Sequence, residues 1–235
     1  MTSDAAIEIA ELDAWYGESK VLHGVGLRVP PGATVALLGR NGAGKTTTLR
    51  AIMGIVRRRS GAIRVRGRDV MRMPLHHMAS LGIGYVPEER GIFAGLTVQE
   101  NLRLPPKVGG GGMSDADIHA LFPNLAERLT SEGTKLSGGE QQMLAIARAL
   151  GSGADILLMD ELTEGLAPVI VQRIRALIQE LKSRGKTIVL VEQNFRFVSK
   201  LADHFYVMEE GRVIDEFPQS AVAARKEQLN RLLSL

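Results

Sequence analysis

Cysteine is missing from all 235 residues of the sequence. Its absence excludes disulfide bonds, thiolate metal ligands and cysteine nucleophiles, and it fits a reducing compartment. Long apolar runs are missing as well, because none approaches the roughly 20 residues that a membrane-spanning helix needs. Residues 1–17 contain no basic segment followed by an apolar stretch. We therefore expect no secretory signal.

The composition and the charge are those of an ordinary globular chain. Hydrophobic residues make up 45% and charged residues 23% of the sequence, which excludes collagen-like, coiled-coil and wholly disordered proteins. The length suits one domain, or one core with a smaller lobe, and we find no internal repeat. A net charge of +3 is too small to predict nucleic acid as a partner. The basic residues within 57–72 are interpreted as a solvated face, with a polyanion site as the alternative.

Two hydrophobic patterns predict strands. Five apolar runs are almost continuous, as in strands covered on both faces: residues 34–38, 82–86, 155–159, 187–191 and 204–208. Other segments alternate and predict a half-exposed antiparallel sheet, with Val25, Leu27, Val29, Ile63 and Val65 pointing inward. Residues 209–212 (EEGR) predict a hairpin turn. The four glycines at 109–112 predict a flexible loop inside the fold.

Helical periodicity appears between the buried runs. One apolar face consists of Ile170, Ile174, Leu177, Ile178 and Leu181. Pro168 suits the first turn of this helix, and Gly185 suits the position after its end. A second stripe consists of Met143, Ile146, Ala147 and Leu150, and residues 223–233 predict an amphipathic helix whose role is packing rather than regulation. This alternation predicts an α/β fold: a mostly parallel sheet with helices on both faces and ligands at the carboxyl ends of its strands.

The most specific motif is GRNGAGKT, which directly follows one buried run and opens a helix. It matches G-x-x-x-x-G-K-[ST], in which successive backbone N–H groups and a helix N-terminus surround phosphate oxygens. Its glycines are expected to adopt backbone conformations closed to other residues. The alternative is a glycine-rich turn that binds nothing. The residues expected at the phosphates are Gly39, Arg40, Asn41, Gly42, Ala43, Gly44, Lys45, Thr46 and Thr47.

Several side chains then take chemical roles. Lys45 supplies a mobile cation for the β- and γ-phosphates, Thr46 can ligate Mg²⁺, and Thr47 can donate to a phosphate oxygen. Asp160 and Glu161 end the run ILLMDE, where carboxylates are costly unless a cation lies nearby. In phosphate-loop enzymes the first acid holds Mg²⁺ through water, and the second can act as general base on the attacking water. The alternative is a strand that ends in solvent.

A second candidate anion site is LSGGEQQ at residues 136–142. Ser137 suits a helix cap, and Gly138 and Gly139 give a backbone concavity at the start of the helix that follows. On these residues alone, an ordinary capped helix is the alternative.

Together, the phosphate loop, LSGGE and ILLMDE, in this order and spacing, resemble the ATP-binding cassette (ABC) ATPases over essentially the whole chain. The resemblance implies one domain over residues 1–235, with the P-loop NTPase cassette fold: a mostly parallel core sheet, an antiparallel β lobe and a helical subdomain at roughly 90–150. It also implies that two cassettes pair head to tail around ATP and Mg²⁺. Ser137, Gly138, Gly139 and Glu140 would then face the nucleotide held by the opposite chain.

Other positions follow from the same resemblance. Tyr16 matches the aromatic residue that stacks on adenine, with Trp15 as the alternative if the register slips. Glu88 stands where the lid has Gln, and Gln193 stands at the switch position where the family has His. Glu88 becomes a third candidate for Mg²⁺, beside Thr46 and Asp160. Ionised Glu88 cannot donate a hydrogen bond, and Gln193 cannot become cationic, so hydrolysis is expected to be slower or to depend more on Glu161.

Two further departures follow the acidic pair: Leu162 replaces Pro, and Ala167 replaces an Asp expected to bridge the dimer. GYVPEERGIFAGLTVQENL, ELTEGLAP and IVLVEQN resemble one ATPase subunit of the branched-chain amino acid importers, and related systems carry urea or short amides. Within that subgroup the changes at 88, 167 and 193 are usual, whereas Leu162 is not.

The expected function is therefore the ATP-hydrolysing motor of a membrane importer at the cytoplasmic face of the plasma membrane. Its expected partners are a second ATPase subunit, identical or not, permease subunits that dock near IFAGLTVQENL, and indirectly an extracytoplasmic solute-binding protein. One alternative is a nucleotide-binding regulator that does not hydrolyse. Another is an ABC ATPase acting on DNA ends or ribosomes, but the chain has neither the long coiled-coil insertion nor the second cassette of those proteins.

Overall fold

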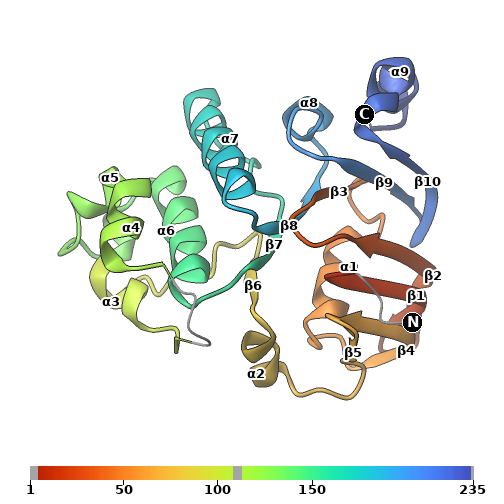
Figure 1. Cartoon of the computed structure of the whole chain (residues 1–235), viewed down its shortest axis with the longest axis horizontal. Helices are drawn as coiled ribbons and strands as arrows, with labels where there is room; N and C mark the ends of the chain where they lie inside the picture. The colour runs from red at the N-terminus through yellow and green to blue at the C-terminus, as the bar shows by residue number, and fades with distance from the viewer. Residues whose placement is uncertain (1–4, 108–112, 234–235) are drawn as a thin grey trace.

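The computed structural model describes residues 5–107 and 113–233, so the glycine stretch predicted at 109–112 to be a loop lies outside the described residues. Figure 1 shows a group of helices at one end, a small sheet at the other, and a second sheet running between them. Within the described ranges no helix is long and apolar enough to cross a membrane.

The central sheet has six strands in the order β10-β9-β3-β8-β7-β6. All neighbours are parallel except the β9–β10 hairpin. The strands are β3 (Thr34–Leu38), β6 (Ile83–Val86), β7 (Ile156–Asp160), β8 (Thr187–Glu192), β9 (His204–Glu209) and β10 (Arg212–Pro218). The five continuous apolar runs are thus confirmed as strands. The predicted hairpin is also confirmed, with Glu210 and Gly211 both at positive φ (45° and 74°), as a two-residue turn requires.

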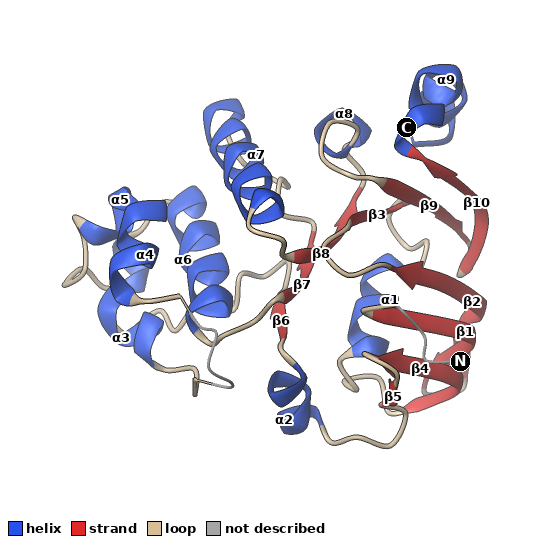
Figure 2. Cartoon of the chain, viewed as in Figure 1, coloured by secondary structure: helices blue, strands red, loops and turns tan. Residues whose placement is uncertain are grey.

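The small sheet is antiparallel, in the order β2-β1-β4-β5 (Figure 2). Its strands are β1 (Ile7–Tyr16), β2 (Ser19–Val29), β4 (Arg58–Val65) and β5 (Arg68–Asp69). The predicted alternation is confirmed, because buried and exposed residues alternate along the end of β2. Several basic residues of 57–72 lie on β4 and β5, where exposed Arg58 pairs with Glu18 at 2.9 Å. This pair favours the interpretation of a solvated face, whereas Arg59 turns inward to the carbonyl oxygen of Ala51 at 2.7 Å and does not belong to that face.

The helices begin and end where caps and breakers predict. Pro168 opens its helix at the first turn, and Gly185, at φ 74°, follows its end, as expected. The helices are α1 (Lys45–Ile52), α2 (Leu75–Met78), α3 (Val98–Arg103), α4 (Asp115–Leu121), α5 (Pro123–Ala126), α6 (Gly138–Gly151), α7 (Pro168–Ser183), α8 (Phe195–Val198) and α9 (Val222–Leu233). Short 3₁₀ turns occupy Ala79–Leu81, Gly133–Lys135 and Gln219–Ala221.

The central sheet separates two hydrophobic cores. Ala36 and Leu38 of β3 pack with the core that includes α6 and α7, whereas Val35 and Leu37 pack with the core of α1 and the antiparallel sheet. Helices therefore lie on both faces, as predicted. The antiparallel sheet, which is the predicted β lobe, helps to cover one face, because its strands alternate and leave one apolar side to bury. Because β3, β8 and β7 are parallel neighbours, their carboxyl ends lie together at one edge of the central sheet.

Candidate active site

The phosphate loop connects β3 to α1, and its glycines serve two different purposes. Gly42 and Gly44 have φ values of 81° and 100°, in the left-handed region that favours glycine. Gly39 does not have a positive φ, so the expectation of an unusual conformation is wrong for this residue. A Cβ at Gly39 would lie 2.6 Å from the carbonyl oxygen of Met208, so close packing against β9 requires glycine there.

The β9–β10 hairpin supports the loop from behind. The amide of Gly211 donates to the carbonyl oxygen of Ala43 at 3.0 Å. The loop, α1 and two carboxylates enclose a cavity of about 250 Å³. The lining residues are Val21, Asn41, Gly42, Ala43, Gly44, Lys45, Thr46, Thr47, Glu88 and Glu161. Most of the predicted loop thus meets Glu88 and Glu161 in one place, whereas the side chain of Arg40 is exposed.

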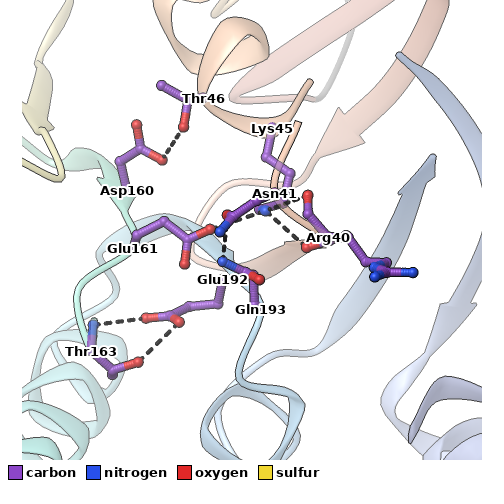
Figure 3. A network of polar contacts seen from close by, with 10 residues as sticks. Arg40, Asn41, Lys45, Thr46, Asp160, Glu161, Thr163, Glu192 and Gln193 are labelled. Atoms are coloured by element: carbon purple, nitrogen blue, oxygen red, sulfur yellow. Dashed lines mark hydrogen bonds and ion pairs between the residues drawn. The ribbon is translucent and has the colours of Figure 1, made fainter. Parts of the chain in front are cut away.

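Lys45 is buried among oxygen atoms. Its Nζ donates to the carbonyl oxygens of Gly39 (2.8 Å) and Arg40 (3.1 Å), and it lies 3.0 Å from Oε1 of Glu161 (Figure 3). Lys45 and Glu161 are 4% and 8% exposed. Burial raises the pKa of Glu161, and the charge of Lys45 partly offsets that effect. A phosphate that binds Lys45 would therefore compete with the carboxylate of Glu161.

A hydroxyl and a carboxylate meet beside the cavity. Thr46 Oγ1 donates to Oδ1 of Asp160 at 2.9 Å, and Tyr85 Oη donates to Oδ2 at 3.0 Å. Asp160 has no exposed surface, and burial raises its pKa. Burial also raises the pKa of Glu88, and the charge of Glu164 raises it further.

These oxygen donors suit Mg²⁺, which takes one or two carboxylates together with water and substrate phosphates. Within 5–107 and 113–233 there is no group of three or more His, Cys, Asp or Glu side chains placed to hold a metal by themselves. The site therefore fits a metal that arrives with phosphate ligands, held by Thr46 and Asp160 with Glu88 close by.

Tyr85 was not predicted from the sequence. It lies on β6 and pairs in register with Leu158 of β7, which places its hydroxyl beside Asp160. A tyrosine in a buried run next to a glycine was an available signal, because buried hydroxyls seek a partner. Only the adjacency of β6 and β7 identifies that partner.

The loop after β7 carries Glu161 in a left-handed conformation. Its φ is 46°, which costs a non-glycine residue about 1 kcal/mol or more. Its amide donates to the carbonyl oxygen of Val191 on β8 at 2.9 Å. Gln193, directly after β8, donates from Nε2 to Oδ1 of Asn41 at 2.5 Å, so the switch position contacts the phosphate loop.

Glu192, between Val191 and Gln193, was also missed. It is 1% exposed, and both of its carboxyl oxygens contact Thr163. Burial, followed by the charge of Glu161, raises the pKa of Glu192 to about 8. A buried acid at the end of an apolar run was a signal in the sequence, but its partner was not.

The predicted residues of the LSGGEQQ segment, called the signature residues from here on, do not line this cavity. Ser137 caps α6, accepting from the amide of Glu140 at 3.3 Å while Glu140 Oε2 accepts from the amide of Ser137 at 2.8 Å. The predicted cap is thus confirmed, and it also uses Glu140. A Cβ at Gly139 would lie 2.7 Å from the side chain of Ile170, so the first turn of α6 lies directly against the first turn of α7. None of Ser137, Gly138, Gly139 and Glu140 lines the cavity of the phosphate loop.

The remaining predicted positions are separated from the cavity. Tyr16 ends β1 with 47% of its surface exposed, and it does not line the cavity. The ring of Trp15 has Lys20 and Arg58 at 5.3 and 5.4 Å from its centroid, which favours Tyr16 as the free aromatic face. Leu162 is fully buried in the core with α6 and α7, and Ala167 is the N-terminal cap residue of α7.

Comparison with known proteins places this geometry in a family. The family model described as ABC transporter matches residues 22–164. The chain belongs to the ABC transporter family. It is accordingly an ABC-type ATPase that binds ATP, as the motifs predicted, and the cassette fold is confirmed by solved cassettes.

Two relatives and one solved structure illustrate the similarity. The chain is 42% identical over 212 residues to the high-affinity branched-chain amino acid transport ATP-binding protein BraG of Pseudomonas aeruginosa, covering 87% of this chain and 89% of that protein. It is 35% identical over 204 residues to the lipopolysaccharide export system ATP-binding protein LptB of Haemophilus influenzae, covering 85% of each. An ATP-binding subunit of an ABC transporter has a TM-score of 0.83 at 27% identity, covering 98% of this chain and 100% of that one. The resemblance to the branched-chain amino acid subgroup is thus confirmed.

Proposed function

We propose that this chain is the ATP-hydrolysing subunit of an ABC importer for branched-chain or other hydrophobic amino acids. The observation that carries the proposal is the convergence of Lys45, Thr46, Asp160 and Glu161 at the carboxyl ends of β3 and β7. The similarity to BraG supports the amino acid substrate and the direction of transport. Urea or a short amide is the alternative substrate within the same role.

The chain's own residues divide the chemistry among them. Backbone amides of residues 39–47 and the N-terminus of α1 bind the phosphates, and Lys45 neutralises the β- and γ-oxygens. Thr46 and Asp160, with Glu88 beside them, would hold Mg²⁺, which offsets phosphate charge when bound. Glu161 accepts a proton from the attacking water, and Gln193 donates to a γ-phosphate oxygen. Tyr16 stacks on adenine.

A second cassette completes the site. Since the signature residues do not line the cavity, we assign them to the nucleotide of a partner cassette, with the N-terminus of α6 facing its γ-phosphate. The partner is a second copy or a related ATPase subunit. Helices α3–α6, within roughly 90–150, form the helical subdomain of this proposal.

We place the permease contact beside residues 87–91, the segment after β6 that contains Glu88 and is called the lid here. A groove of about 340 Å³ is lined by residues of β6, the lid and α6, among them Tyr85, Pro87, Arg90 and Arg148. Phe93, at the start of IFAGLTVQENL, is 51% exposed, and the guanidinium of Arg148 lies 5.0 Å from its ring. A cytoplasmic helix of a permease subunit would dock there. The chain then associates with the cytoplasmic face of the membrane through that subunit, which also receives solute from an extracytoplasmic binding protein.

Phosphate release from Mg-ATP by the purified chain tests the enzymatic part of the proposal. Turnover supports a motor, whereas Mg²⁺-dependent ATP binding without turnover indicates a regulatory module. Absence of any Mg²⁺-dependent affinity for ATP overturns the proposal altogether. Co-purification with permease subunits, followed by identification of the ligand of their binding protein, then separates branched-chain amino acids from urea and short amides.

A further inference from the structure

Glu192 is a buried carboxyl group that the proposed reaction does not use. It is the last residue of β8 and does not line the cavity of the phosphate loop. Its Oε1 accepts from the amide of Thr163 at 3.1 Å, and its Oε2 lies 3.0 Å from Oγ1 of the same residue (Figure 3). One side chain therefore accepts from both hydrogen-bond donors of Thr163.

Thr163 belongs to the loop that carries Glu161. That loop touches β8 at two places: at the amide of Glu161, which donates to Val191, and at Thr163, which contacts Glu192. Glu161, at the first of these two contacts, has the left-handed backbone conformation described above. Such a conformation persists only where surrounding contacts hold it in place, and the bonds to β8 are contacts of that kind.

The other neighbour of Glu192 in the chain is Gln193, whose amide group contacts Asn41 of the phosphate loop. Glu192 thus contacts the loop that carries Glu161 and directly precedes Gln193, the two residues to which hydrolysis is assigned. A shift of the Thr163 contact would move the carboxylate of Glu161 relative to Gln193 and Lys45. Displacements of about 1 Å at reacting groups can reduce rates about 100-fold.

We propose that Glu192 is a positioning residue for ATP hydrolysis, which holds the loop of Glu161 on the end of β8 through its paired contacts with Thr163. This inference rests on the proposed function, since it takes Glu161 as the base.

The chemistry of the contact shows which substitution should preserve it. The amide of Thr163 can only donate, whereas its hydroxyl can donate or accept. In the structure both groups donate to Glu192, the amide to Oε1 and the hydroxyl to Oε2, and burial raises the pKa of the carboxyl. Glutamine keeps the first bond with its carbonyl oxygen, and its NH₂ group can donate to the hydroxyl, which then accepts. Methionine fills similar space but leaves the buried amide of Thr163 unpaired.

Two matched pairs of full-length variants test the proposal. Glu192→Met removes both bonds and Thr163→Val removes only that of the hydroxyl, whereas Glu192→Gln and Thr163→Ser keep the paired contact. We expect Glu192→Met to lower kcat by about tenfold or more and Thr163→Val to lower it by several-fold, with KM for ATP changed less than about twofold. The two conservative variants should stay within about twofold of the natural chain. Hydrogen exchange of residues 160–165 should quicken only in the first two.

Each outcome decides the question. Unchanged kcat in Glu192→Met, or equal losses in Glu192→Met and Glu192→Gln, would overturn the positioning role while leaving the proposed function intact. A natural chain that binds ATP without hydrolysing it would overturn both. Unaltered exchange at residues 160–165 in Glu192→Met would refute the contact itself, whatever the activity.

Discussion

At the scale of single residues, Lys45 has two competing anionic partners. In the structure its ammonium group contacts Glu161, yet the same group is assigned to the β- and γ-phosphates of ATP. On the proposed assignment, ATP binding would break this buried ion pair and free the carboxylate of Glu161 to act as the base. The base would then become available only when the substrate is bound.

The variant Glu161→Gln separates these two effects. It should bind Mg-ATP several-fold more tightly, because Lys45 no longer has an anionic competitor, and its turnover should fall about 100-fold or more. Equilibrium binding and phosphate release measure the two effects. Glu164→Gln is the matched control, since Glu164 is an exposed acid of the same loop. Full turnover by Glu161→Gln would remove Glu161 from its role.

The buried carboxyl of Glu192 predicts a pH-dependent stability. Its pKa rises from 4.5 to about 8 in the folded chain because of burial and then the charge of Glu161, whose own partner is Lys45. The folded state therefore holds a proton that the unfolded state has already released. The stability associated with this group is complete below pH 4.5 and is lost as the pH rises toward 8.

Glutamine at position 192 does not titrate, so the melting temperature of Glu192→Gln should exceed that of the natural chain by a margin that grows between pH 5 and 8. Thermal unfolding in matched buffers measures the difference. A margin that stays constant across this range would contradict a raised pKa.

Tyr85 orients the carboxylate of Asp160, so its hydroxyl should influence the metal rather than ATP itself. We expect Tyr85→Phe to raise the Mg²⁺ concentration for half-maximal hydrolysis by about tenfold, as loss of such outer contacts does elsewhere, with kcat at saturating Mg²⁺ little changed. Tyr206→Phe is the control, because its hydroxyl contacts only the backbone of Arg28. An unaltered Mg²⁺ dependence in Tyr85→Phe would count against this role.

At the scale of elements, the β9–β10 hairpin supports the phosphate loop. A Cβ at Gly211 would lie 2.2 Å from the carbonyl oxygen of Val21, and φ there is 74°. Gly67 has a similar φ of 76° with nothing within 4 Å, which makes it a matched control. Gly67→Ala should cost about 1 kcal/mol of unfolding free energy, and Gly211→Ala about 3 kcal/mol or more, together with weaker ATP binding. Urea unfolding tests this, and equal costs would contradict the bracing role.

The sequence predicted elements well and contacts between them poorly. Strands β7 and β8 were evident because buried parallel strands are almost continuously apolar, and α7 was evident from its periodicity, Pro168 and Gly185. Hydrophobic patterns carry no information on strand order. The contacts of Tyr85 with Asp160 and of Glu192 with Thr163 depend on β6, β7 and β8 lying side by side, and neither could be predicted.

At the scale of the whole molecule, the proposed head-to-tail pair predicts complementation. Lys45→Ala should disable the site that uses its own phosphate loop, and Ser137→Asp should disable the opposite site by placing a negative charge against phosphate. Aspartate still caps a helix, and Ser137→Asn is the neutral control. Each variant alone should be inactive, whereas an equal mixture should recover roughly a quarter of the natural phosphate release, because half the pairs are mixed with one intact site each. No recovery on mixing would refute the shared site.

The close packing of Gly139 on Ile170 has a consequence for such a pair. Helix α7 continues from the loop that holds Glu161, and α6 begins at Ser137, so the segments that carry these two residues meet where the helices start. Each protomer would then link its own reaction centre mechanically to the nucleotide held by its neighbour. Hydrolysis of ATP at one site would disturb the binding of ATP at the other. The two ATP molecules would then be hydrolysed in turn rather than independently.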